Sequence, residues 1–79
     1  EAVEIYAEIK PLAWHLASDS QAGQFFAEGN KHISDLALAF YWQQDRLIPV
    51  WRVWTGNQVV HVAASDGRIL QIKIQLGGQ

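Results

Sequence analysis

The segment that most constrains the fold is residues 47–73, LIPVWRVWTGNQVVHVAASDGRILQIK. It contains three runs of β-branched, aromatic and aliphatic residues, which favour β-strands. Two turn signals separate these runs, Thr55-Gly56-Asn57 and Asp66-Gly67. Pro49 is expected to open the first run, where a missing N–H does least harm. The pattern predicts an antiparallel meander with strands at residues 50–54, 59–64 and 69–76.

The preceding half of the chain predicts a strand, a short helix and one further strand. Residues 3–9 alternate between apolar and polar side chains with the period of a half-buried strand. Gln21–Glu28 has helical spacing, with N-cap candidates at residues 18–20 and a stop at Gly29. Residues 33–42 place Leu36, Leu38, Phe40 and Trp42 on one parity, which is expected to face the core. The predicted fold class is therefore α+β, a small antiparallel meander sheet with one short helix packed on one face.

Size and composition indicate one domain spanning residues 1–79, expected to be excised from a longer chain because it has no initiator methionine. The net charge is −2 and the six basic residues are not clustered, which argues against nucleic-acid binding. The chain has no cysteine, so disulfides and thiol chemistry are excluded. Any membrane attachment is expected to come from an upstream anchor, because no apolar run approaches about 18 residues.

The reactive residue types do not form a recognisable catalytic or metal-binding motif. His15, His32 and His61 lack the spacing of zinc ligands, and each is expected to be an ordinary loop or strand histidine. Ser18, His15 and Asp19 could be drawn as a triad, but they lie within five residues of one another without a strained nucleophile turn. The sequence therefore predicts no catalytic, cofactor-binding or metal-binding residues, and a protein that is not an enzyme.

The tryptophans are the strongest candidates for contact with a partner. Trp51 and Trp54 are separated by an odd number of residues, so in a strand they lie on opposite faces, one in the core and one outside. The outer one, with Trp42 or Tyr41, could form an aromatic patch for a protein partner. The alternative is that these rings only fill space, with Arg52 covering an indole. The partner-binding candidates are therefore Trp42, Trp51, Trp54, Tyr41 and Arg52.

Residues 35–41, 47–53 and 59–69 resemble a PepSY-type module, and are most similar to the C-terminal domain of the YycH/YycI regulators of Gram-positive bacteria. The shared features are the strand DLALAFY, the Pro-x-Trp-x-Val step and the strand that leads into a glycine turn. Val60-His61 and Ala63 depart from the aromatic and the acidic or amide positions of that pattern, and Asp66-Gly67 replaces its Thr-Gly turn.

This resemblance implies a non-catalytic domain on the extracellular face of the cell membrane, tethered upstream, which adjusts a cell-wall-sensing histidine kinase (a two-component system) by protein contact. Within the PepSY group, the alternative is a peptidase-associated inhibitory or propeptide module. A third alternative is a domain that binds cell-wall glycan or peptide through an exposed tryptophan. The open edge of a small sheet also suits pairing with a partner strand, including that of a second copy in a homodimer.

Overall fold

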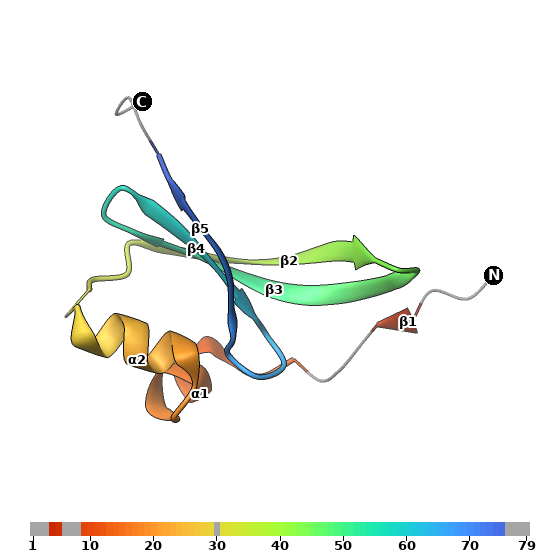
Figure 1. Cartoon of the computed structure of the whole chain (residues 1–79), viewed down its shortest axis with the longest axis horizontal. Coiled ribbons are helices and arrows are strands. Elements are labelled where there is room, and N and C mark those ends of the chain that lie inside the picture. The colour runs from red at the N-terminus through yellow and green to blue at the C-terminus, as the bar shows by residue number, and fades with distance from the viewer. Residues whose placement is uncertain (1–3, 6–8, 30, 76–79) are drawn as a thin grey trace.

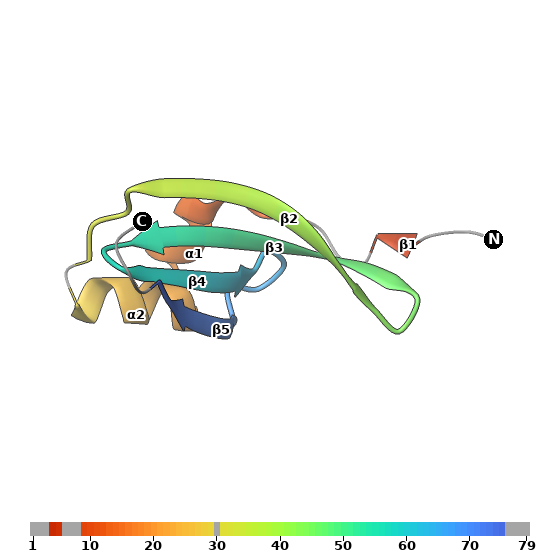
Figure 2. The same ribbon diagram turned by 90° about the horizontal axis from the view of Figure 1, so that it is seen from above.

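The predicted α+β class is confirmed by a computed structural model, which describes residues 4–5, 9–29 and 31–75. A meander of four antiparallel strands carries two short helices on one face (Figures 1 and 2). Within these residues the elements follow the order β1 (Glu4–Ile5), α1 (Leu12–Ala17), α2 (Gln21–Glu28), β2 (Asp35–Gln43), β3 (Arg46–Thr55), β4 (Gln58–Ala63) and β5 (Ile69–Ile74).

The sheet is built around β3, which pairs with β2 along one side and with β4 along the other. β5 pairs with β4 and forms the far edge of the sheet. β1 adds a short parallel pairing with Arg46 and Leu47 at the start of β3. The strand predicted at residues 3–9 is therefore present at Glu4–Ile5, and residues 6–8 lie outside the described part of the chain.

Two-residue turns close both hairpins around β3. Gln44 and Asp45 connect β2 to β3 with φ of 51° and 66°, and Gly56 with φ of 59° opens the next turn. Paired positive φ values match the twist of a hairpin in a type I′ turn. The predicted turn at residues 55–57 is confirmed, and the predicted polar connector at residues 43–46 is itself a tight hairpin.

Pro49 does not open β3 as expected, but is buried at its fourth position. It pairs with Phe40 of β2, and it lies between the part of β3 that pairs with β1 and the part that pairs with β4. Among the described residues, no strand pairs with this flank of β3 at Pro49, so a residue without an N–H is tolerated. The carbonyl of Pro49 still forms a backbone hydrogen bond, which it accepts from the amide of Ala64 at 3.0 Å.

The sequence predicts one helix, whereas the structure has two. The short apolar stretch Leu12–Ala17 forms α1, which starts directly after Pro11. Proline favours the start of a helix because its missing N–H would have no partner there. The second helix has the predicted bounds, and Ser20 is the residue that caps it, accepting from the Gly23 amide at 3.0 Å.

His15 joins the helices to the meander and is not the solvated loop residue that the sequence suggests. It lies in α1, is fully buried, and its Nε2 donates to the Ala64 carbonyl at 3.1 Å. The Asp66-Gly67 turn packs against it: Gly67 has φ of 79°, and a Cβ there would come within 2.8 Å of His15 Nδ1. Gly67 also accepts a hydrogen bond from the Ala22 amide at 2.9 Å. Turn geometry and close packing therefore both require glycine.

The hydrophobic core lies between the helices and the centre of the sheet. Its buried members come from α1, α2, β3 and β4, with Leu16, Phe25, Ile33, Trp51 and Ile69 packed around them. The phenylalanine pair of α2 does lie against the sheet, with Phe26 buried and Phe25 at the margin. The buried residues are Leu12, Ala22, Phe26, Val53, Val60 and Val62.

Candidate interaction surface

The large even-numbered residues of β2 lie on the same face as the core but remain partly exposed. In the β2–β3 register, Leu36 is opposite Val53 and Leu38 is opposite Trp51, so both pairs face the helix side. Nevertheless Leu36, Leu38, Phe40 and Trp42 are 42%, 39%, 42% and 64% exposed. The expectation that these alternating residues of β2 are buried in the core is therefore wrong. We call these four residues the apolar strip.

The backbone edge beside the apolar strip is also open. Among the described residues, β2 pairs only with β3, and Figure 2 shows it along one border of the sheet. Natural edge strands usually carry a lysine, a proline or a bulge that prevents pairing with another chain. β2 has none of these along its nine residues, and its single charged side chain is Asp35 at the first position. This edge therefore has the properties of a strand that accepts a partner strand.

The aromatic residues singled out from the sequence do not form one patch. Trp51 is half-buried on the helix side, where its indole N–H donates to the Lys10 carbonyl at 2.8 Å. Trp54 is half-buried on the opposite face, with the Arg52 guanidinium 5.2 Å from its ring centre. The prediction that these two rings face opposite ways is confirmed. Trp42 belongs to the apolar strip, and Tyr41 lies on the other side of β2.

The face away from the helices carries a small polar cluster. The Tyr41 hydroxyl lies 3.3 Å from His61 Nδ1, and His61 is opposite Arg52 in the β3–β4 register. Burial, followed by the positive charges of Arg52 and Lys73, holds the pKa of His61 below its ordinary value of 6.5. A neutral His61 with its proton on Nε2 can accept a hydrogen bond from the Tyr41 hydroxyl at Nδ1, so the cluster is a hydrogen-bonded support for the sheet.

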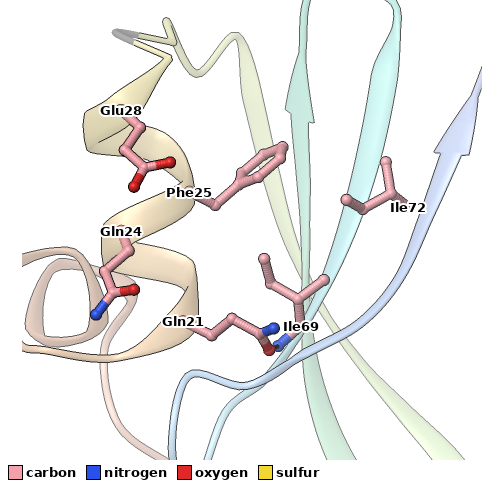
Figure 3. Close-up of a pocket in the computed structure, with 6 residues that line it drawn as sticks. All are labelled: Gln21, Gln24, Phe25, Glu28, Ile69 and Ile72. Carbon is pink, nitrogen blue, oxygen red and sulfur yellow. Dashed lines mark hydrogen bonds between the residues drawn. The ribbon is translucent and has the colours of Figure 1, made fainter.

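A groove of about 300 Å³ lies between α2 and β5, lined by Phe25, Ile69 and Ile72 with polar residues at its rim (Figure 3). Gln21, one of these, accepts a hydrogen bond from the Ile69 amide at 2.8 Å, which ties the helix to the strand. The side-chain nitrogen of Gln24 donates to the Asp19 carbonyl at 3.4 Å. These amide groups therefore already have roles in holding the fold together.

Ser18 and His15 of the hypothetical triad have other partners. The hydroxyls of Ser18 and Ser20 both donate to the His15 carbonyl, at 3.1 Å and 2.6 Å, whereas the His15 ring points to Ala64. Across residues 4–5, 9–29 and 31–75, no three histidine, aspartate or glutamate side chains gather as metal ligands would. In the same residues, no helix has the length and apolar character needed to cross a membrane.

The structure therefore adds Leu36, Leu38 and Phe40 to the candidate residues, and it leaves Trp42 as the one member of the original set that lies on the apolar strip. Their alternation with small residues is visible in the sequence, but it is equally typical of a buried face. Compared with known proteins, the chain matches no family model, no curated protein and no solved structure.

Proposed function

We propose that this domain is a non-catalytic interaction module that binds protein through the apolar strip and the open edge of β2. The observation that carries the proposal is the exposure of four large apolar side chains in a row beside a strand edge that no described strand pairs with. Scattered exposed apolar residues are ordinary, whereas a contiguous row marks a contact surface. Burying it removes apolar area from water, and the edge supplies main-chain hydrogen bonds to a partner strand.

Within this proposal, the partner class is a membrane sensor kinase on the extracellular side. This part is supported by the resemblance of residues 35–69 to YycH/YycI regulators, which act by contact. A role without catalysis agrees with the contacts of the polar side chains. Those of His15, Gln21 and His61 form hydrogen bonds within the domain. A peptidase partner, as for PepSY propeptides, would use the same surface.

The test is site-specific photo-crosslinking in the cells that produce the protein. Phe40 is replaced by benzoylphenylalanine, which keeps an aromatic ring at a strip position that is 42% exposed. The matched control carries the same group at Gln24, an exposed position on α2. We expect protein adducts from position 40 that are absent from position 24, identified by mass spectrometry of the crosslinked band.

The identity of the adduct separates the partner classes. A histidine kinase or a peptidase in the adduct assigns the partner, and an adduct between two copies of this chain is also protein contact through the strip. If illumination gives no protein adduct at position 40, or gives the same adducts at position 24, binding through the strip is rejected.

A further inference from the structure

We propose that a second copy of this chain pairs with the open edge of β2, through antiparallel pairing of β2 with β2 of the other copy about a two-fold axis at Ala39, so that the two apolar strips lie side by side. This inference rests on the proposed function and names one partner for the same surface. The evidence for it is that an antiparallel pair of β2 strands brings together side chains that share a face and keeps like charges apart.

The register follows from the length of the strand. β2 spans residues 35–43, so its midpoint is residue 39, and only the register centred there pairs all nine residues. On the helix side it places Leu36 opposite Trp42 of the second copy, and Leu38 opposite Phe40. On the other face it places Ala37 opposite Tyr41, and Ala39 opposite itself. Residues that share a face remain together, so two apolar strips become one continuous surface.

Charge favours the same register. Asp35, the only charged residue of β2, lies opposite Gln43 of the second copy, away from the other Asp35. In the β2–β3 register Gln43 is opposite Arg46, so each Asp35 lies in one cross-strand row with the Arg46 of the other copy. The two-fold axis repeats this pairing at both ends of the interface. Like charges are separated and opposite charges are brought into one row, as complementary interfaces require.

The area available sets the expected strength. Four side chains that are 39% to 64% exposed present on the order of 350 Å² per copy, given about 150–250 Å² for a large side chain, and strand pairing covers only the part of this area that faces the neighbouring strand. A standard interface buries about 800 Å² per partner, so the strand hydrogen bonds and neighbouring atoms must supply the remainder. We therefore expect a reversible dimer with a Kd of about 10 μM or weaker, not an obligate one.

The absence of native cysteine allows a direct test of the register. In the proposed dimer the two Ala39 residues are directly opposite, with Cβ atoms about 4.5–5.5 Å apart, which is close to disulfide geometry. Ala39→Cys should therefore form a disulfide-linked dimer in a glutathione buffer. Ala37→Cys is the matched control, because two residues 37 would lie about 14 Å apart along the strands. Mixing Ala37→Cys with Tyr41→Cys should restore crosslinking between unlike chains.

Sedimentation equilibrium of the unmodified protein supplies a second readout. The average mass should rise with concentration from 8.9 kDa towards twice that value. Phe40→Lys places a charge opposite Leu38 of the other copy and should weaken the dimer at least tenfold. Ile74→Lys, at a residue 59% exposed on the opposite edge strand, should leave the dimer intact. Circular dichroism of each variant confirms that it folds.

A monomer at every concentration up to about 1 mM, with Ala39→Cys crosslinking no better than Ala37→Cys, would overturn the dimer. A dimer that Ile74→Lys dissociates, or that crosslinks equally well through Ala37→Cys, would overturn this register. The photo-crosslinking result separates the two proposals. If adducts to a different protein persist at position 40, the interaction module stands without the dimer; if position 40 forms no protein adduct, both proposals fail.

Discussion

Leu36 and Val53 are cross-strand neighbours on one face of one sheet, yet Val53 is fully buried and Leu36 is 42% exposed. Val53 contacts the core that α1 and α2 complete, whereas the strip on β2 extends beyond that cover. The two regions have the same alternation of apolar residues and opposite environments. A periodic pattern therefore specifies which side chains share a face, but not which layer covers that face.

At the turn end of the β2–β3 hairpin, the exposure of Phe40 and Trp42 has a geometric cause. The eight residues of α2 span about 12 Å and the six of α1 about 9 Å, at 1.5 Å per residue. The ten residues of β3 span about 33 Å. Two helices of this length cannot cover the long β2–β3 hairpin, and Figure 1 shows it extending past them. The covered region holds the fold together, and the uncovered region remains available for contact.

The largest effect is expected at Gly67, where the helices meet the meander. Gly67→Ala should lower the free energy of unfolding by about 3 kcal/mol or more, because it combines a positive φ with overlap against Ser20 and His15. A Cβ at this position would lie 2.6 Å from the Ser20 Cβ and 2.8 Å from the His15 Nδ1. Urea denaturation followed by tryptophan fluorescence measures the change.

Gly56→Ala is the matched control for this prediction. Gly56 has a similar φ of 59°, but no atom of a residue beyond its chain neighbours lies within 4 Å of the place that an added methyl group would take. Only the backbone cost of about 1–2 kcal/mol is expected there. Equal losses at the two glycines would show that the contact with His15 and Ser20 contributes nothing.

The comparison between covered and uncovered residues is tested directly by truncating the neighbours Val53 and Leu36. Val53→Ala should cost about 2 kcal/mol, because it leaves a cavity in the closed core. Leu36→Ala removes more atoms, but it should cost about 1 kcal/mol or less because this side chain already faces solvent. Denaturation is measured at a concentration well below the expected dimer Kd. The reverse order would mean that β2 is covered in solution.

The smallest effect concerns His61 on the face away from the helices. Its pKa is lower in the folded state than the ordinary 6.5, so the unfolded chain takes up the proton more readily. The stability that a neutral His61 contributes is therefore present above about pH 6.5, and it is lost as the pH falls from there through the folded pKa. His61→Gln should show a shallower loss of Tm between about pH 7.5 and 5. Identical slopes for the two proteins would show that His61 does not titrate differently on folding.

Several elements are predictable because their signals are local. Helix Gln21–Glu28 follows from capping residues and spacing, and the turns at Gly56 and Gly67 follow from residues that tolerate positive φ. Helix Leu12–Ala17 is not predictable in this way, because a six-residue apolar stretch is too short to show a helical period. The burial of His15 depends on Ala64, which lies 49 residues away in sequence, so no local pattern indicates it.

For the candidate surface, the sequence correctly places Trp51 and Trp54 on opposite faces and names Trp42. It does not identify Leu36, Leu38 and Phe40 as surface residues, because a strand with one apolar face normally has that face buried. The long-range register and the positions of the helices decide this, and neither is encoded in the alternation itself.

Local signals in the sequence are enough to predict an α+β domain with a meander of alternating strands, because strand periodicity, helix caps and turn residues act over a few neighbouring positions. The exposure of the apolar face of β2, beside the buried face of β3, follows from the packing of the helices on the sheet. The reason is physical: burial depends on which parts of the sheet α1 and α2 cover, and the large side chains of β2 on that face remain 39% to 64% exposed.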